Sequence, residues 1–260
     1  MKTIITFLII FSLAIHAKGQ SISASVISSA GDYYTANGYS LSTTIGETVI
    51  DNYVFENTKL STGFQQGSGN RILYLKFFLE GLFNGIDMNQ AYDDIGPHFQ
   101  AGIADKFQFF LAKNTYPNMQ LYTDTAVEIS INGNSMINLP ACFTGTNYLF
   151  IRHRNHMETW SSSPVSFAND IINYDFTTTA TKAFGDNQKQ VSPNTFAIFV
   201  GDVNQDGVVD ISDLVAMDAD LTNGTLGYIV YDLNGDGVVD ISDLVIIDEN
   251  LTNGVVVMTP

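Results

Sequence analysis

The sequence predicts a mainly β fold followed by a small α-helical module at the C-terminus. Residues 71–200 contain several short runs of β-branched and aromatic residues, separated by turn signals such as Asn132-Gly133-Asn134. Residues 201–260 instead contain two near-identical segments, 30 residues apart, each followed by apolar residues at helical spacing. Many short strands with regular turns favour an antiparallel sandwich of the immunoglobulin-like type for the larger part.

Residues 1–19 have the features of a secretory signal peptide. Lys2 provides the positive start, Ile4–Ile15 is an apolar stretch too short to span a bilayer, and Ala17-Lys18-Gly19 is a small-x-small cleavage site. No later apolar run reaches about 18 residues, so we expect no membrane span. The sequence therefore predicts a secreted protein, extracellular or at the cell surface, with the periplasm as the alternative compartment.

Residues 20–66 are predicted to form an N-terminal β-segment, because apolar and polar residues alternate between Gly- and Asn-containing turns. A Gly- and Ser-containing stretch, Gln65–Asn70, is the predicted linker to the next domain. The strands expected in this segment are 25–27, 40–45, 48–55 and 60–64.

Residues 71–200 are predicted to form the β-sandwich domain. Cys142, the only cysteine in the chain, lies in an apolar context, so we expect a buried, unreactive thiol and no internal disulfide. Trp160 is expected to be a core aromatic residue. The strands predicted here are Ile72–Leu79, Phe107–Leu111, Ala126–Ile131, Tyr148–Arg152 and Ile172–Phe176, with one short helix at Met88–Tyr92.

The two near-identical segments have the spacing of a calcium-binding loop of the EF-hand kind. Oxygen-bearing side chains occupy loop positions 1, 3, 5, 9 and 12, Gly occupies position 6, and the backbone carbonyl of position 7 is the remaining ligand. Gly207 and Gly237 stand at the sharp turn, where a residue without Cβ is least strained. The pattern predicts two bound Ca²⁺ ions, with ligands from Asp202, Asn204, Asp206, Val208, Asp210 and Asp213, and from Asp232, Asn234, Asp236, Val238, Asp240 and Asp243.

Each loop is predicted to open an amphipathic helix that ends at Gly224 or Gly254, while the residues before each loop are β-like. A calcium loop with an exit helix, duplicated within residues 201–254, resembles the dockerin type I module. The resemblance implies two Ca²⁺ ions and docking onto a cohesin module. Cohesin recognition in that family uses hydroxyl side chains and a basic pair, and this chain has Asp218-Ala219 and Asp248-Glu249 where the basic pair would fall. We therefore expect no binding to type I cohesins.

The negative charge of the chain is concentrated in this module. Residues 197–260 contain 12 acidic residues and no Lys or Arg, whereas the other 196 residues contain 15 acidic and 11 basic residues. Such a cluster repels itself unless cations bind, so folding of the module and Ca²⁺ uptake are expected to be coupled. The acidity also argues against nucleic acid and anionic membranes as partners.

The segment His153-Arg154-Asn155-His156 resembles a motif in a family of uncharacterised secreted bacterial proteins. In that family the β-domain with this motif precedes a dockerin-like end, and the resemblance brings no activity with it. We expect the end of a strand whose polar side chains hydrogen-bond a neighbouring loop. A zinc site with His98 is the alternative, but His153 and His156 are expected to point in different directions, and catalytic zinc needs three converging ligands.

No catalytic constellation is visible in the sequence, since there is neither a nucleophile with its base nor a recognisable carboxylate pair outside the loops. The sequence favours a non-catalytic protein with a structural or protein-interaction role at the cell exterior. Its module would contact the chain's own β-domain or a protein with a basic or calcium-bridged surface. The alternatives are an accessory component of extracellular polysaccharide degradation, through cohesin docking and glycan binding, and a glycoside hydrolase with an unrecognised active site.

Overall fold

The computed structural model describes residues 30–36, 39–45, 51–55, 58–62, 70–113 and 120–260. It divides into two compact units, Met1–Gln66 and Gly67–Pro260. The first unit contains two antiparallel hairpins, whose strands are β1 (Ala30–Ala36) with β2 (Tyr39–Ile45), and β3 (Asp51–Phe55) with β4 (Thr58–Thr62). Strands are thus present at three of the four places expected in this segment, while residues 25–27 lie outside the described residues.

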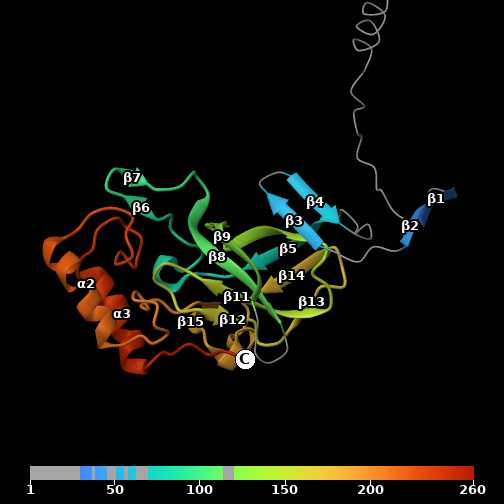
Figure 1. Cartoon of the computed structure of the whole chain (residues 1–260). Helices are drawn as coiled ribbons and strands as arrows, with labels where there is room; N and C mark the ends of the chain where they lie inside the picture. Colours follow the sequence, from blue (N-terminus) through green and yellow to red (C-terminus); the bar gives the residue numbers. More distant parts are fainter. Residues whose placement is uncertain (1–29, 37–38, 46–50, 56–57, 63–69, 114–119) are drawn as a thin grey trace, which may run out of the picture. The chain divides into compact units, whose positions relative to one another are not determined.

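Two sheets form the body of the second unit (Figure 1). The first has the strand order β10-β5-β14, with an antiparallel and a parallel pair, and the second has the order β12-β11-β8-β9 with β13 also paired to β11. The mainly β character expected for this region is confirmed. The strands are β5 (Asn70–Lys76), β8 (Ile103–Lys113), β9 (Gln120–Ser130), β10 (Asn134–Pro140), β11 (Thr146–Arg152), β12 (Thr159–Trp160), β13 (Val165–Ser166) and β14 (Ile171–Asp175).

Shorter elements accompany these strands. One hairpin and one turn of 3₁₀ helix lie between β5 and β8, a second hairpin and two such turns follow β14, and the helix expected at Met88–Tyr92 is absent. Met88 instead donates its backbone N–H to the Ile131 carbonyl, so this short segment bonds to a neighbouring loop and not to itself. These elements are β6 (Tyr92–Asp93) with β7 (Gly96–Pro97), β15 (Lys189–Ser192) with β16 (Thr195–Ala197), η1 (Glu80–Leu82), η2 (Ala180–Lys182) and η3 (Phe184–Asp186).

The main apolar core contains residues of both sheets. Leu73 and Leu75 of β5 are buried with Phe107, Phe109 and Leu111 of β8, because alternate residues of a strand face the same side. Trp160 is buried as expected, in a separate cluster where its ring stacks on Phe150 at 4.1 Å.

Cys142 is exposed, so the prediction of a buried thiol is wrong. It lies in the turn after β10, and Arg71 holds that turn through hydrogen bonds to the carbonyls of Ala141 and Phe143. The apolar neighbours that suggested burial belong to a surface turn whose backbone is fixed by a charged side chain.

The two C-terminal helices are α2 (Ile211–Asn223) and α3 (Ile241–Asn253), which lie together at one end of the unit (Figure 1). They enclose a second apolar core that includes Met217 and Ile247, and Met157 and Val200 of the preceding region also belong to it. The expected boundary between residues 200 and 201 therefore falls inside one compact unit. Within the described part of the chain, no helix is both long and apolar enough to cross a membrane.

Candidate metal centre

Each of the two loops ends in the same capped helix start. Asp210 accepts a hydrogen bond from the Ser212 backbone N–H at 2.7 Å, and Asp240 accepts one from the Ser242 N–H at 2.7 Å. These side chains satisfy donors that a helix start leaves unpaired. The prediction that Gly224 and Gly254 end the helices is confirmed, since both adopt the left-handed conformation, with φ of 56° and 61°.

The carboxylate at loop position 12 ties the beginning of each loop to its end. Asp213 accepts from the backbone N–H groups of Val203 at 2.9 Å and Asp210 at 3.0 Å. Asp243 repeats the arrangement, with Leu233 at 2.7 Å and Asp240 at 2.9 Å. Both carboxylates are buried, and burial is the main cause that raises their pKa. The loops are therefore closed by the residues that the spacing singled out.

Asp202, at position 1 of the first loop, is the least satisfied of these groups. The residue is 2% exposed, one oxygen accepts from the Gly207 N–H at 3.2 Å, and Oδ1 is buried without a hydrogen-bond partner. Burial, followed by the nearby carboxylates of Asp213 and Asp206, raises the pKa of Asp202 to about 6. A buried carboxylate oxygen without a partner costs free energy, which a bound cation would offset.

Positions 3 and 5 of each loop face one another. The Asn204 amide nitrogen lies 3.0 Å from Asp206 Oδ2, and Asn204 Oδ1 accepts from the Asp206 N–H at 2.8 Å. The same two distances occur between Asn234 and Asp236. At position 7, Val208 points its N–H to Asp206 Oδ1 at 3.0 Å. Val208 pairs with Val256 and Val238 with Leu226 in isolated bridges, which fix both turns.

The second loop differs from the first because it is pressed against the β region. Both oxygens of Asp232 accept backbone hydrogen bonds, from Gly235 at 2.9 Å and Gly237 at 3.1 Å. Burial raises the pKa of Asp232 to about 6, helped by Asp243 and opposed by Arg154. A Cβ on Gly237 would stand 2.7 Å from the Asp93 carbonyl oxygen, so the loop contacts β6 through bare backbone.

The segment His153–His156 holds this second loop. The Arg154 guanidinium donates to the carbonyls of Ile229 and Asp232, and the Asn155 amide donates to those of Val230 and Asp232, both at 3.0 Å. The expectation that these polar side chains hydrogen-bond a neighbouring loop is confirmed. We call Arg154 and Asn155 the clamp. The clamp hydrogen-bonds to backbone carbonyls, and the sequence pattern could not reveal these contacts.

The two histidines beside the clamp face each other, so the expectation that they point in different directions is wrong. Their Nδ1 atoms lie 3.0 Å apart, and both also lie near Asn155 Oδ1. His153 Nε2 lies 3.2 Å from Asp105 Oδ2, and Asp105 is fully buried. Burial alone would raise the pKa of Asp105, but His153 and Arg154 hold it below its usual range. The motif is thus a buried polar network beneath the second loop.

Within residues 70–113 and 120–260, no group of three or more His, Cys, Asp and Glu side chains is arranged to hold a metal ion. The alternative zinc site required His98 as a ligand. The His98 side chain instead bonds Asp93 at 2.7 Å and stacks on Tyr228. The loops also offer Asn side-chain and backbone carbonyl oxygens, which are calcium ligands outside that group. The partnerless Oδ1 of Asp202 and the crowded carboxylates are the features that fit a cation.

No protein family model matches the chain, and no curated protein matches it. Among solved structures, the chain is similar to two interface mutants of a type II cohesin–X–dockerin complex from Acetivibrio cellulolyticus. The first is 15% identical over 70% of this chain and 95% of that chain, with a TM-score of 0.40. The second is 16% identical over 72% and 97% of the two chains, with a TM-score of 0.38. At this distance the likeness carries no functional conclusion.

Proposed function

We propose that this chain is an exported, non-catalytic protein whose residues 202–254 bind two Ca²⁺ ions and present an interaction surface to another protein. The observation that supports this proposal is the duplicated loop and helix, closed in both copies by Asp213 and Asp243. The buried, partnerless oxygen of Asp202 adds a position where a cation would replace a missing hydrogen bond. Calcium prefers oxygen ligands of this kind in flexible loops.

The ion would be held by the oxygens at loop positions 1, 3, 5 and 12, with the position 7 carbonyl and position 9 completing the set. Ca²⁺ supplies positive charge to a segment that contains 12 acidic residues and no Lys or Arg. Neutralisation removes the repulsion between Asp202, Asp206 and Asp213, and it stabilises the folded module because the unfolded chain lacks the preformed loop.

The proposed interaction surface consists of one apolar pair at the start of each helix. Ile211 and Val215 of α2, and Ile241 and Val245 of α3, are between 66% and 70% exposed. Residues four apart on a helix are neighbours, so each pair forms a small apolar patch. Asp218 and Asp248 are exposed on the same helices. A partner with an apolar centre and basic rim would complement this surface, whereas one built for a basic pair would leave these charges unpaired.

The stoichiometry of binding tests the calcium part of the proposal. Isothermal titration of the mature chain with Ca²⁺ should give two sites, and Asp202→Ala and Asp232→Ala should each reduce the number to one. Asp218→Ala and Asp248→Ala remove the same charge from exposed helix positions and should leave two sites. Two sites in both loop variants, with the fold intact by circular dichroism, would contradict the assignment.

The partner part is tested on the exposed pairs. A partner captured from the native secretome in Ca²⁺ should be released by EDTA, and its affinity should fall when Ile211→Asp and Ile241→Asp are combined. The exposed Ile86 of the β region provides the control, since Ile86→Asp should leave binding unchanged. A partner retained equally by the double variant binds elsewhere. Tight binding of a type I cohesin would contradict the charge argument.

A further inference from the structure

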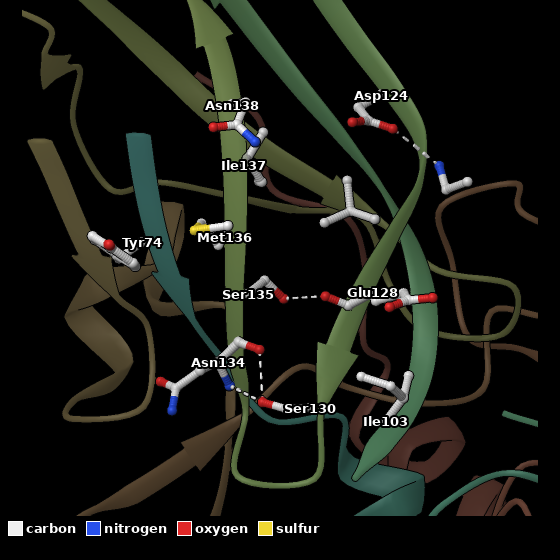
Figure 2. Close-up of a pocket in the computed structure, with 12 residues that line it drawn as sticks. Tyr74, Ile103, Asp124, Glu128, Ser130, Asn134, Ser135, Met136, Ile137 and Asn138 are labelled. Atoms are coloured by element: carbon white, nitrogen blue, oxygen red, sulfur yellow. Dashed lines mark hydrogen bonds between the residues drawn. The ribbon is translucent and has the colours of Figure 1, made fainter. Parts of the chain in front are cut away.

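A second candidate site lies on the β region, far in sequence from the calcium loops. A groove of ≈ 590 Å³ runs over β10, between β9 on one side and β5 on the other (Figure 2). Its lining includes the side chains of Tyr74, Asp124, Met136 and Asn138. At about 3.3 Å per residue, the stretch of β10 from Asn134 to Asn138 is about 13 Å long. The groove is therefore long enough for an extended chain.

The groove exposes two apolar side chains, those of Tyr74 and Met136, that the main core does not use. Met136 pairs directly with Tyr74 across β10 and β5, and the two are 56% and 45% exposed. Their sequence neighbours Ile137 and Leu73 point to the opposite face and are buried in the main core. An exposed ring beside an exposed thioether leaves apolar surface in water, where a ligand with apolar faces would cover it.

Side chains already occupy hydrogen-bonding groups at the strand edge beside the groove, which disfavours the addition of a peptide strand. The Asp124 carboxylate accepts from the Ala126 N–H at 3.3 Å, and the Ser135 hydroxyl donates to the Glu128 carbonyl at 2.8 Å (Figure 2). Side chains thus occupy backbone groups of β9 that a peptide strand would need. The polar groups that face a ligand are the amide of Asn138 and the carboxylate of Asp124, since the Asn134 amide already donates to Asn132 Oδ1 at 3.0 Å.

The charge of the lining selects among the remaining ligands. Among the described residues that line the groove there is no Lys or Arg, and the carboxylate of Glu128 lies 3.6 Å from Lys106. Nucleic acids and sulfated or acidic polymers are bound through cationic side chains, so their recognition here is disfavoured. A neutral ligand with hydroxyl groups and apolar ring faces suits an aromatic ring, an amide and a carboxylate.

We propose that this groove binds a neutral glycan chain. One sugar ring lies against the Tyr74 ring, the Met136 thioether covers the adjacent apolar face, and Asn138 and Asp124 hydrogen-bond to hydroxyl groups. This proposal is independent of calcium binding by the loops, because none of these residues lies in residues 202–254. It assigns the β region a ligand and the C-terminal module a protein partner.

Titration of the mature chain with cellohexaose, xylohexaose and mannohexaose tests the proposal directly. At least one hexaose should bind, and Tyr74→Ala should weaken it at least about tenfold, which corresponds to about 1.4 kcal/mol. Tyr74→Phe keeps the ring and should retain most of the affinity, and Asn138→Ala should weaken binding severalfold. Tyr92 is the matched control, because it is 41% exposed and lies outside the groove, so Tyr92→Ala should bind like the native chain.

Three outcomes would overturn the proposal. The first is that none of the three hexaoses binds at millimolar concentration. The second is that Tyr74→Ala, shown by thermal unfolding to be folded, keeps its full affinity. The third is that hyaluronan, a polyanion, binds more tightly than every hexaose and loses affinity with added salt. Titration in the presence of EDTA distinguishes this site from the loops, since glycan binding should persist there.

Discussion

Gly81 marks the closest approach between the β region and the second loop. A Cβ at this residue would stand 2.0 Å from the Leu233 backbone oxygen. Because this clash is with the backbone, no side-chain rotation could relieve it. The Gly81 N–H also lies 3.3 Å from His156 Nε2, so the residue joins the loop to the buried network. The absence of a side chain here allows two backbones to pack directly.

Gly81→Ala should therefore destabilise the protein by several kcal/mol, as expected for forced overpacking or displacement of a buried segment. Gly224→Ala is the control, because its Cβ would meet open space and only the left-handed conformation would cost about 1–2 kcal/mol. Chemical denaturation of both variants measures the difference. A Gly81→Ala protein as stable as Gly224→Ala would show that the two segments are not packed as described.

His156 gives the stability of the protein a pH dependence. It is fully buried, its Nε2 accepts from Gly81, and its Nδ1 lies 2.8 Å from Asn155 Oδ1, an arrangement that needs the neutral ring. Burial, followed by electrostatic interaction with the neighbouring His153 and Arg154 side chains, lowers the pKa of His156 well below 6.5. The unfolded chain therefore binds a proton near pH 6 that the folded chain does not.

The contribution of His156 to stability is complete above about pH 6.5 and is lost as the pH falls towards its lowered pKa. Between pH 7 and pH 5 this residue should reduce the free energy of unfolding by up to about 2 kcal/mol, at 1.36 kcal/mol per pKa unit. Urea unfolding at the two pH values measures the loss. His156→Asn should show a smaller loss, because the titrating ring is gone, and an equal loss would assign the effect to other groups.

At the scale of single elements, α2 and α3 differ in how they are attached. Asn250 of α3 is buried and donates to Glu80 Oε2 at 2.7 Å and to the Val200 carbonyl at 2.9 Å. Lys189 adds ion pairs to Glu80 at 3.2 Å and to Glu249 at 2.9 Å. The equivalent residue of α2 is Asp220, which is partly exposed. The two copies are alike in their loops but not in their attachment.

Asn250→Ala should lower the free energy of unfolding by about 1–3 kcal/mol, because the Val200 carbonyl loses this donor and Glu80 Oε2 keeps only the Val200 N–H. Asp220→Ala removes the corresponding side chain of α2 and should change stability by less than about 0.5 kcal/mol. Thermal and denaturant unfolding of the two variants provide the comparison. Equal effects would mean that α3 is not the anchored helix.

The local sequence pattern was sufficient to predict the segments whose structure depends mainly on their own residues. The loop spacing fixed both helix starts and both glycine ends, and the strand runs placed β5, β8, β9, β11 and β14. β10 was missed although Ser135, Ile137 and Leu139 alternate inward, because Asn134, Met136 and Asn138 dilute its apolar composition. The helix expected at Met88–Tyr92 failed because distant backbone groups bond to that segment.

The candidate sites likewise divide into parts that local sequence predicts and parts that depend on distant residues. The loop residues follow from spacing alone, whereas the clamp donates to carbonyls of residues 229–232, and a carbonyl carries no sequence signal. The groove at Tyr74 also could not be predicted. It depends on the register of β10 against β5 and on the neighbouring β9, which come from three separate parts of the sequence. The prediction for Cys142 failed for a related reason, because Arg71, which fixes the turn that contains Cys142, is distant in the sequence.

At the scale of the whole unit, the main core and the module core are separate clusters, and Met157 and Val200 of the β region belong to the module core. If the loops bind Ca²⁺ as proposed, its removal should open the module first, because the acidic residues then repel each other, while residues 70–200 keep their own core. The first loop should open before the second, which the clamp holds from outside.

Hydrogen exchange with and without EDTA tests this order. Amides of α2 should lose protection most, amides of α3 less, and amides of β5 and β8 least. Arg154→Met, which removes the clamp's charge while keeping an apolar stem, should bring α3 to the level of α2. Loss of protection throughout the unit in one step would show that the two cores behave as a single cooperative body.

The clamp has a further consequence for the order in which the chain folds. The contact between Asn155 and Asp232 joins residues 77 positions apart in the sequence, and the contact between Glu80 and Asn250 joins residues 170 positions apart. Contacts of such separation form late, because the entropy of closing a long loop must be overcome first. The β region, synthesised earlier, provides the surface on which the second loop settles. In stopped-flow refolding, Trp160 fluorescence should reach its native value before Ca²⁺ uptake is complete.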